Sequence, residues 1–155
     1  MSVSKKLMGF LNGRHIRYDT VKHPIAYTAQ EIAASLHVSG SLLAKTVIVR
    51  LNGRMAMVVL PASYRIDFNR MKEEFGADIE LASESEFNRR FPDCEPGAMP
   101  PFGNLYEMPV FVAESLAGKK EIVFNAGSHK DAIRMNYEDF NQLAHPQVIQ
   151  LSTHC

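Results

Sequence analysis

The chain has 155 residues, 46% of them hydrophobic, which suits one domain with its own core. Lys plus Arg and Asp plus Glu both total 17, so the formal net charge is zero. A protein that coats a nucleic-acid backbone needs a marked positive excess, so the composition disfavours that class and leaves room only for a local basic face.

The two cysteines, Cys94 and Cys155, have neither CxxC nor zinc-site spacing. We therefore expect no metal, no cofactor and no disulfide framework, and a reduced, cytoplasmic setting. The sequence at the N-terminus lacks the pattern of a signal peptide, and no run reaches the roughly 18 apolar residues of a membrane span.

In chain order, Ser2 or Ser4 is predicted to cap a first helix that ends at Asn12-Gly13. Residues 16–21 alternate as a strand does, and His23-Pro24 interrupts them. A capping box at Thr28–Glu31 predicts a helix to about Leu36, followed by a second turn over residues 37–43.

The clearest unit is a hairpin of residues 46–51 and 55–60 around Asn52-Gly53, a dipeptide typical of tight hairpin turns. Both strands are continuously apolar, which indicates a central position in a sheet. Asp67 is predicted to cap a helix that Gly76 ends.

The remaining chain mixes short strands, short helices and loops. A capping box at Ser83–Glu86 opens a helix to Phe91. Strands are expected at 79–82, 110–112, 121–125, 132–135 and 148–151, helices at 114–117 and 137–143, and a tight connection at Gly127-Ser128-His129. About seven strands and five helices without regular alternation predict an α+β fold with a mixed sheet, in a single domain over residues 1–155.

Three short segments carry candidate chemistry. Lys45, at the mouth of a strand, could hold a phosphate or a carbonyl oxygen as a point charge, or be a solvated edge lysine. The glycine of Gly127-Ser128-His129 could present backbone amides to an oxyanion, and His129 could act as a base or a donor; alternatively this is a surface turn. His23, held extended by Pro24, could point into a cleft or pack on Tyr27.

A stiff proline and glycine loop, residues 96–103, holds the apolar side chains of Met99 and Phe102. Thr46 and Ser128 offer hydroxyls, but a catalytic triad is recognised by geometry and not by sequence order. GxSxG, GxGxxG, P-loop and HExxH motifs are absent, so the sequence gives little support to a metal or nucleotide enzyme.

Taken together, the segments resemble the family of YbaK and the prolyl-tRNA synthetase-associated editing domain. The resemblance runs from about Tyr18 to Leu143. It rests on His23-Pro24 with Thr28 and Glu31, 44–49, Leu60-Pro61-Ala62, Gly97 with 100–103, Val112 with 114–116, and Phe124 to Ser128.

The resemblance implies a twisted, partly closed sheet of about seven strands flanked by helices. It also implies a free-standing aminoacyl-tRNA deacylase that hydrolyses the ester of a mischarged tRNA, carrying a small amino acid such as Ala, Ser or Cys on tRNA(Pro) or a related tRNA. The family's functional lysine maps to Lys45, and its glycine-containing pocket loop maps to Gly127, Ser128 and His129. The expected substrate-binding residues are His23, Thr46, Met99, Pro100, Pro101, Phe102 and Gly103.

The chain departs from cysteinyl-tRNA(Pro) deacylases, which are richer in glycine where it has Ser128-His129-Lys130. An alanine-specific branch places a pocket histidine near this position, which His129 could match. Ala113-Glu114 stands where the family usually has an aspartate before Ser-Leu. The amino acid that is cleared therefore stays open.

The mechanism that we expect is hydrolysis by a positioned water, with backbone amides near Gly127 facing the scissile carbonyl and Lys45 holding the ester region or a phosphate. Met99 and Phe102 would set the size of the pocket. Cations that could touch tRNA phosphates, or simply form a solvated face, are Lys5, Lys6, Arg14, Arg17, Lys22, Lys119 and Lys120.

The expected partner is the acceptor end of a mischarged tRNA; a synthetase or an elongation factor could recruit the protein, although no sequence feature indicates either. The alternative is a non-catalytic module that binds a small molecule or tRNA in the same pocket. Turnover of an aminoacyl ester distinguishes the two. A DNA-binding role is disfavoured, because there is no helix-turn-helix with a basic second helix.

Overall fold

A computed structural model describes residues 4–22, 43–76, 78–150 and 152–154 of the chain. The predicted helix that begins at the Thr28–Glu31 capping box lies outside these residues. His23, expected to bind substrate, also lies outside them.

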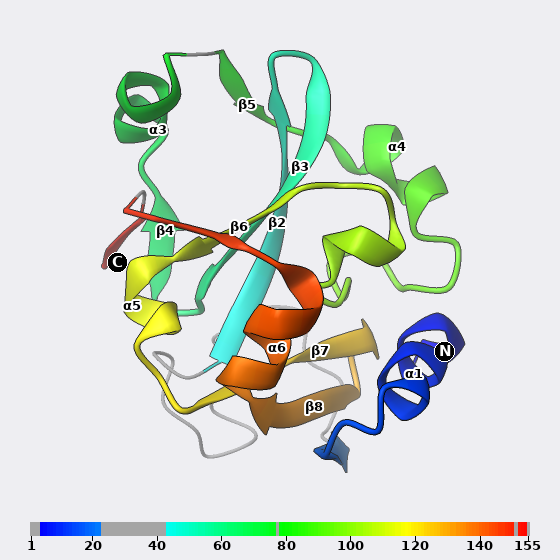
Figure 1. The fold of residues 1–155 in the computed structure, drawn as a ribbon. Helices are drawn as coiled ribbons and strands as arrows, with labels where there is room; N and C mark the ends of the chain where they lie inside the picture. The colour runs from blue at the N-terminus through cyan, green and yellow to red at the C-terminus, as the bar shows by residue number, and fades with distance from the viewer. Residues whose placement is uncertain (1–3, 23–42, 77, 151, 155) are drawn as a thin grey trace.

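The described chain is organised by a mixed, strongly twisted sheet (Figure 1). The strand order in its main path is β1 (Tyr18–Lys22), β8 (Asp131–Asn136), β7 (Glu121–Ser128), β2 (Leu43–Leu51), β3 (Arg54–Pro61), β6 (Val110–Ala113) and β9 (Gln147–Ile149). A further strand, β5 (Ile79–Leu81), pairs with β2, and β4 (Tyr64–Ile66) pairs with β10 (Ser152–His154) in a separate ribbon. This confirms the α+β class with a mixed sheet of about seven strands.

Helices surround the sheet in short pieces (Figure 1). In the described part of the chain the α-helices are α1 (Lys5–Gly13), α3 (Phe68–Phe75), α4 (Glu84–Phe87), α5 (Glu114–Ala117) and α6 (Tyr137–Ala144). The segment between β5 and β6 also contains two 3₁₀ turns, η1 (Asn88–Arg90) and η2 (Gly103–Leu105).

Local signals located several of these elements correctly. The β2–β3 hairpin turns at Asn52 and Gly53, whose φ angles are 52° and 80°. Asp67 caps α3 by accepting a hydrogen bond from the Arg70 amide at 3.1 Å, and Gly76 ends the helix in the left-handed region. The capping box at Ser83 and Glu86 is present, although α4 ends at Phe87 and a 3₁₀ turn replaces its predicted second half.

The largest correction concerns the segment around Gly127. We predicted a tight connection over residues 127–129, but β7 continues to Ser128 and the turn is formed by His129 and Lys130. The ladder between β7 and β8 carries an irregularity between Asn125 and Ser128 that absorbs the extra residues. The β4–β10 ribbon was not predicted.

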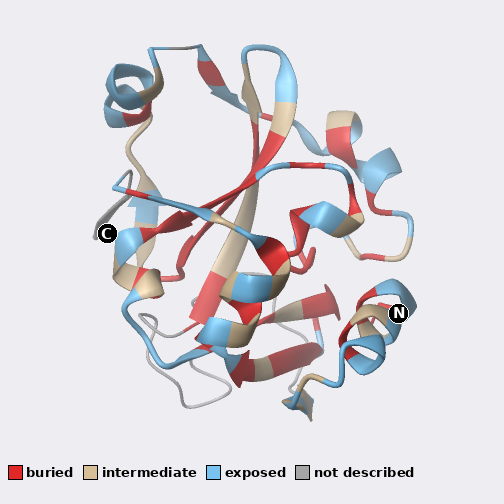
Figure 2. Cartoon of the chain, in the orientation of Figure 1, coloured by how far each residue is buried: buried red, intermediate tan, exposed pale blue. Residues whose placement is uncertain are grey.

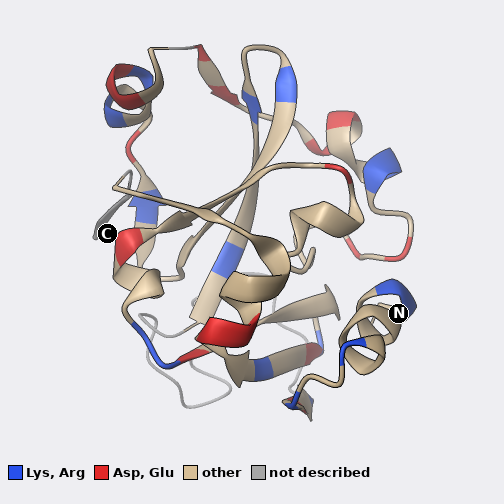
Figure 3. Cartoon of the chain, viewed as in Figure 1, with Lys and Arg blue, Asp and Glu red and all other residues tan. Residues whose placement is uncertain are grey.

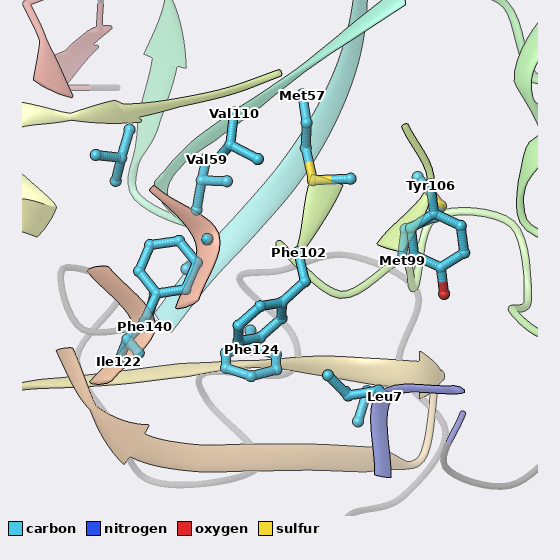
Figure 4. Packing of buried hydrophobic residues seen from close by; sticks show 14 of the residues in the cluster. Leu7, Met57, Val59, Met99, Phe102, Tyr106, Val110, Ile122, Phe124 and Phe140 are labelled. Carbon is cyan, nitrogen blue, oxygen red and sulfur yellow. The ribbon is translucent and has the colours of Figure 1, made fainter. Parts of the chain in front are cut away.

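Buried side chains form two clusters, one on each face of the sheet. Figure 2 shows the buried positions, in red, along the central strands. The larger cluster is centred on Phe102, which is fully buried against the rings of Phe124 and Phe140 at centroid distances of 5.7 and 5.4 Å (Figure 4). The smaller cluster, on the opposite face, includes Leu60 and Phe111. Successive side chains of β2 point to opposite faces of the sheet, so the face to which each residue points decides whether it joins one cluster or the other.

Candidate functional site

A small cavity opens where one edge of β2 loses its strand partners. That edge pairs in parallel with β7 at Leu43 and Ala44, and antiparallel with β5 from Val49 to Leu51. Between these two ladders no described strand pairs with this edge. The cavity, of about 180 Å³, is lined by Leu43, Ala44, Lys45, Thr46, Val47, Gly97, Met99 and Asn125.

Lys45 and Thr46, both expected at the site, lie in its wall on β2. The ammonium of Lys45 donates a hydrogen bond to the carbonyl oxygen of Ala62 at 3.4 Å, just beyond the end of β3. This contact holds the end of the Lys45 side chain beside the chain that follows β3. Figure 3 shows cations and anions spread over all parts of the fold, in keeping with the zero net charge.

The loop of residues 96–103 divides into a part at the cavity and a part in the core. Gly97 and Met99 line the cavity. Phe102 is fully buried and also contacts the Phe10 ring of α1 at 5.9 Å, so its side chain packs in the core instead of setting the size of this cavity. Pro100, Pro101 and Gly103 are buried too and lie outside the lining of this cavity.

Gly103 is tightly enclosed. A Cβ at this position would lie 2.5 Å from the Met108 carbonyl oxygen and 2.6 Å from a methyl of Val110. Only glycine allows this approach, so the observed constraint on Gly103 comes from the packing of the loop onto the start of β6.

The amide of Gly127 does not face an open site. It donates to the carbonyl of Ala98 at 2.9 Å, and the carbonyl of Gly127 accepts from the Glu95 amide at 2.8 Å. The amide of Gly127 itself is therefore not among the backbone amides near Gly127 that we expect to face the scissile carbonyl, because this donor is already used. What the glycine supplies is a φ of +102° and close packing, since its Cβ would lie 3.0 Å from the Cβ of Ser4.

Ser128 is also used within the fold. Its buried hydroxyl donates to Asp131 at 2.7 Å and accepts from the Lys130 amide at 3.0 Å. These bonds shape the turn between β7 and β8. The hydroxyl is thereby engaged within this turn, and Ser128 is not among the residues that line the cavity.

His129 lies behind the cavity wall. Its ring Nε2 is 2.7 Å from the Pro96 carbonyl oxygen, and its amide donates to the Glu95 carboxylate at 3.2 Å. A Cβ on Gly97 would lie 3.5 Å from the imidazole ring. The histidine is only 6% exposed, and it supports the segment that carries Gly97.

Sequence reasoning missed a polar cluster beneath this loop. The Ser4 hydroxyl donates to Asp93, the Tyr106 hydroxyl donates to the same carboxylate at 3.2 Å, and the Cys94 thiol lies 3.5 Å from the Tyr106 hydroxyl. Burial raises the pKa of Cys94 to about 12 and raises the pKa of Tyr106. Burial alone would raise the pKa of Asp93, but hydrogen bonds, led by the one from Ser4, lower it overall.

Asn125 is a polar residue of the cavity wall that we did not single out for the site. It lies on β7 and lines the cavity. Its Oδ1 is buried and has no hydrogen-bond partner among the described residues. Nothing in the local sequence indicates this, because the position depends on how β7 meets β2.

Within the described residues, no group of three or more His, Cys, Asp or Glu side chains could hold a metal ion. No helix in the same part of the chain is both long enough and apolar enough to cross a membrane.

Solved structures with the same fold were found for nearly the whole chain. A protein proposed as a trans-editing enzyme for prolyl-tRNA synthetase has a TM-score of 0.83 and 20% identity, over 97% of this chain and 96% of that one. A hypothetical protein has a TM-score of 0.85 and 24% identity, over 96% of this chain and all of that one. Similarity at this level of identity shows the fold, which is YbaK-like as expected. A search of curated proteins gave no match.

The sequence model of the aminoacyl-tRNA editing domain matches residues 23–143. This span covers most of the chain and contains all the residues that line the cavity. The chain belongs to the aminoacyl-tRNA editing domain family. Helix α1 and strand β1 lie outside the matched span.

Proposed function

We propose that this protein is a trans-acting deacylase that hydrolyses the ester between a small amino acid, such as Ala, Ser or Cys, and a mischarged tRNA, with tRNA(Pro) or a related tRNA as the carrier. The observation that carries the proposal is the cavity of about 180 Å³ beside Lys45, in a chain of the editing-domain family. Ordinary ligand pockets measure about 300–1,000 Å³, so this one suits an amino-acid side chain and not a nucleotide.

In the proposed reaction a water molecule adds to the carbonyl carbon of the ester. The bond between this carbon and the ribose oxygen then breaks, which releases the free amino acid and a tRNA with its terminal hydroxyl restored. The ammonium of Lys45 would stabilise negative charge on the carbonyl oxygen or bind the adjoining phosphate. Because the Gly127 amide is engaged, Lys45 is the charged donor at the cavity on which this proposal depends.

His129 has a positioning role in this proposal. Its contact with the Pro96 carbonyl and its packing against Gly97 hold one wall of the cavity in place. Met99 contributes to the same wall and would limit the size of the acyl group, while Thr46 contributes to the wall on β2. Exclusion by size spares the larger amino acid that the tRNA should carry.

Exposed cations on and after α1 would contact the tRNA backbone. Lys5, Lys6, Arg14 and Arg17 are all exposed, and Lys6 lies 4.9 Å from the centre of the Tyr106 ring. The zero net charge predicts weak intrinsic affinity that falls steeply with salt. A deacylation rate that does not change with salt would contradict these contacts.

The test is a panel of alanyl-, seryl-, cysteinyl- and threonyl-tRNA, in which loss of the ester is followed under single turnover. We expect loss of one or a few esters, and a fall of at least about 100-fold for Lys45→Ala, the scale of losing one charged donor to a developing oxyanion. Lys72→Ala, at an exposed lysine of α3, is the matched control and should behave as wild type. Binding of the same tRNAs without any ester loss would support the non-catalytic module instead.

A further inference from the structure

The edges of β2 and β7 place Lys45 and Asn125 at equivalent positions. The last parallel pair between the two strands is Ala44 with Phe124, and both side chains join the larger core cluster. Because side chains alternate along a strand, the next residues, Lys45 and Asn125, project from the opposite face. Each is the first residue beyond the ladder on its own strand, and both line the cavity.

Asn125 carries a buried acceptor that the described part of the chain leaves unpaired. Its Oδ1 has no hydrogen-bond partner among the described residues, although the side chain lies in a cavity wall. Buried polar atoms nearly always find a partner, so an orphan oxygen in a cavity wall indicates that the missing donor comes from what the cavity binds.

The volume of the cavity decides which part of the substrate supplies this donor. Pockets for drug-sized ligands measure about 300–1,000 Å³, so a cavity of about 180 Å³ has room for a small aminoacyl group but not for the ribose and the adenine as well. The hydrogen-bond donor that every aminoacyl group carries is its α-amino group. This group is attached to the carbon next to the ester carbonyl, the region that we assign to Lys45.

We infer that Asn125 binds the α-amino group of the aminoacyl ester, with Oδ1 accepting a hydrogen bond from the amine, and so makes the protein selective for esters of α-amino acids. The inference rests on the proposed function. Asn125 and Lys45 would then hold the two ends of the same short unit, the amine on one side and the carbonyl oxygen on the other. Esters without the amine would leave the buried oxygen unpaired and react slowly.

The test compares each aminoacyl-tRNA with its deamino analogue, for example alanyl-tRNA with propionyl-tRNA and seryl-tRNA with 3-hydroxypropionyl-tRNA. The pair used is the one whose amino acid is removed fastest by the wild-type protein. Each rate is divided by the spontaneous rate of hydrolysis of the same ester, because an α-amino group activates the ester by itself. We expect the wild type to prefer the amino ester by about 10-fold or more, the scale of leaving one buried acceptor unpaired.

Three variants separate this role from a structural one. Asn125→Leu, of similar size but without an acceptor, should lose the preference for the amino ester. Asn125→Asp keeps an acceptor oxygen in the same place and should keep the preference. Asn88→Ala, at an exposed position of η1, should behave as wild type. Thermal denaturation of all three checks that they fold.

The outcomes are distinct. If Asn125→Leu folds, hydrolyses the amino ester and keeps the wild-type preference, the inference is wrong while the deacylase proposal stands. If Asn125→Leu does not fold, Asn125→Asp decides: loss of the preference in this variant overturns the inference, and its retention supports it. If the wild-type protein hydrolyses no ester in the panel, both the inference and the proposed function fail.

Discussion

The Ser4 hydroxyl donates a hydrogen bond to the carboxylate of Asp93, although 89 positions of the chain separate the two residues. The same hydroxyl accepts from the Leu7 amide as the N-cap of α1, and the Ser4 amide donates to the Ala126 carbonyl at 2.8 Å. One buried serine thus starts a helix, ties it to β7 and fixes the loop that leads to Gly97. Helix α1 is therefore part of the support of the candidate site, although it lies outside the span matched by the family.

Ser4→Ala should destabilise the protein by about 1–2 kcal/mol, because it removes a helix cap and leaves the half-buried Asp93 carboxylate with one donor fewer. Urea denaturation measures this change. Ser85→Ala, at an exposed serine of α4, is the control and should cost less than about 0.5 kcal/mol. Equal costs for the two variants would show that the contact with Asp93 contributes nothing.

The protein should lose stability at acid pH as Asp93 becomes protonated. Hydrogen bonds lower the pKa of this carboxyl in the folded state, so its contribution is present above the unfolded-state pKa of about 3.9 and is lost as the pH falls through the folded-state value. Asp93→Asn should therefore be less stable than wild type at pH 7, and the difference should shrink below about pH 4. Denaturation midpoints from pH 2 to 7 test this, and a constant difference would refute it.

Gly127→Ala should destabilise the protein by about 1–3 kcal/mol. The new methyl would be held at a φ of +102° and would press against Ser4 at 3.0 Å. The matched control is Gly9→Ala in the middle of α1, where a Cβ meets nothing within 4 Å and alanine favours the helix by about 1 kcal/mol. Opposite signs for the two variants in urea denaturation are the expected result.

Phe102→Ala should cost about 3–5 kcal/mol, as other buried phenylalanines do, because the ring is surrounded by Phe10, Phe124 and Phe140. Phe102→Leu fills most of the space and should leave the choice among aminoacyl esters unchanged. If Phe102→Leu folds well but accepts larger amino acids, Phe102 limits the size of the pocket, which its position in the core does not predict.

The Cys94 thiol should resist modification in the folded protein. Its pKa of about 12 and its buried position leave almost no thiolate at pH 8. In a Cys155→Ser background, which leaves Cys94 as the one remaining cysteine of the sequence, a thiol reagent should react within seconds only after denaturation. Rapid reaction under native conditions would show that the cluster around Asp93 opens readily.

Local signals predicted the parts of the fold that depend on a few neighbouring residues, such as the turn at Asn52-Gly53 and the cap at Asp67. They misassigned Gly127 to a turn, because a glycine after an apolar run usually marks one, whereas here it lies within β7 at an irregularity of the β7–β8 ladder. They placed Phe102 in a pocket, because an apolar residue in a proline-rich loop has the same sequence pattern whether it points to a ligand or to the core.

Local sequence signals also predicted part of the candidate site. Lys45 and Thr46 stand at the start of a recognisable strand, and the structure places them in the cavity wall with Gly97 and Met99. Asn125 could not be found in this way. Asn125 lies opposite Lys45 because of the register between β2 and β7, and only the assembled sheet defines this register.

The short parallel ladder between β2 and β7 also limits how this protein can change. Two walls of the cavity are continuations of strands that are hydrogen-bonded to each other at Leu43 and Ala44, so the spacing of those walls is a property of the backbone. A wider mouth would require this ladder to break, whereas Met99, on the loop that forms the third wall, can be exchanged without touching it. Adaptation to a bulkier amino acid would therefore begin with substitutions in the loop, while the spacing between β2 and β7 stays constant.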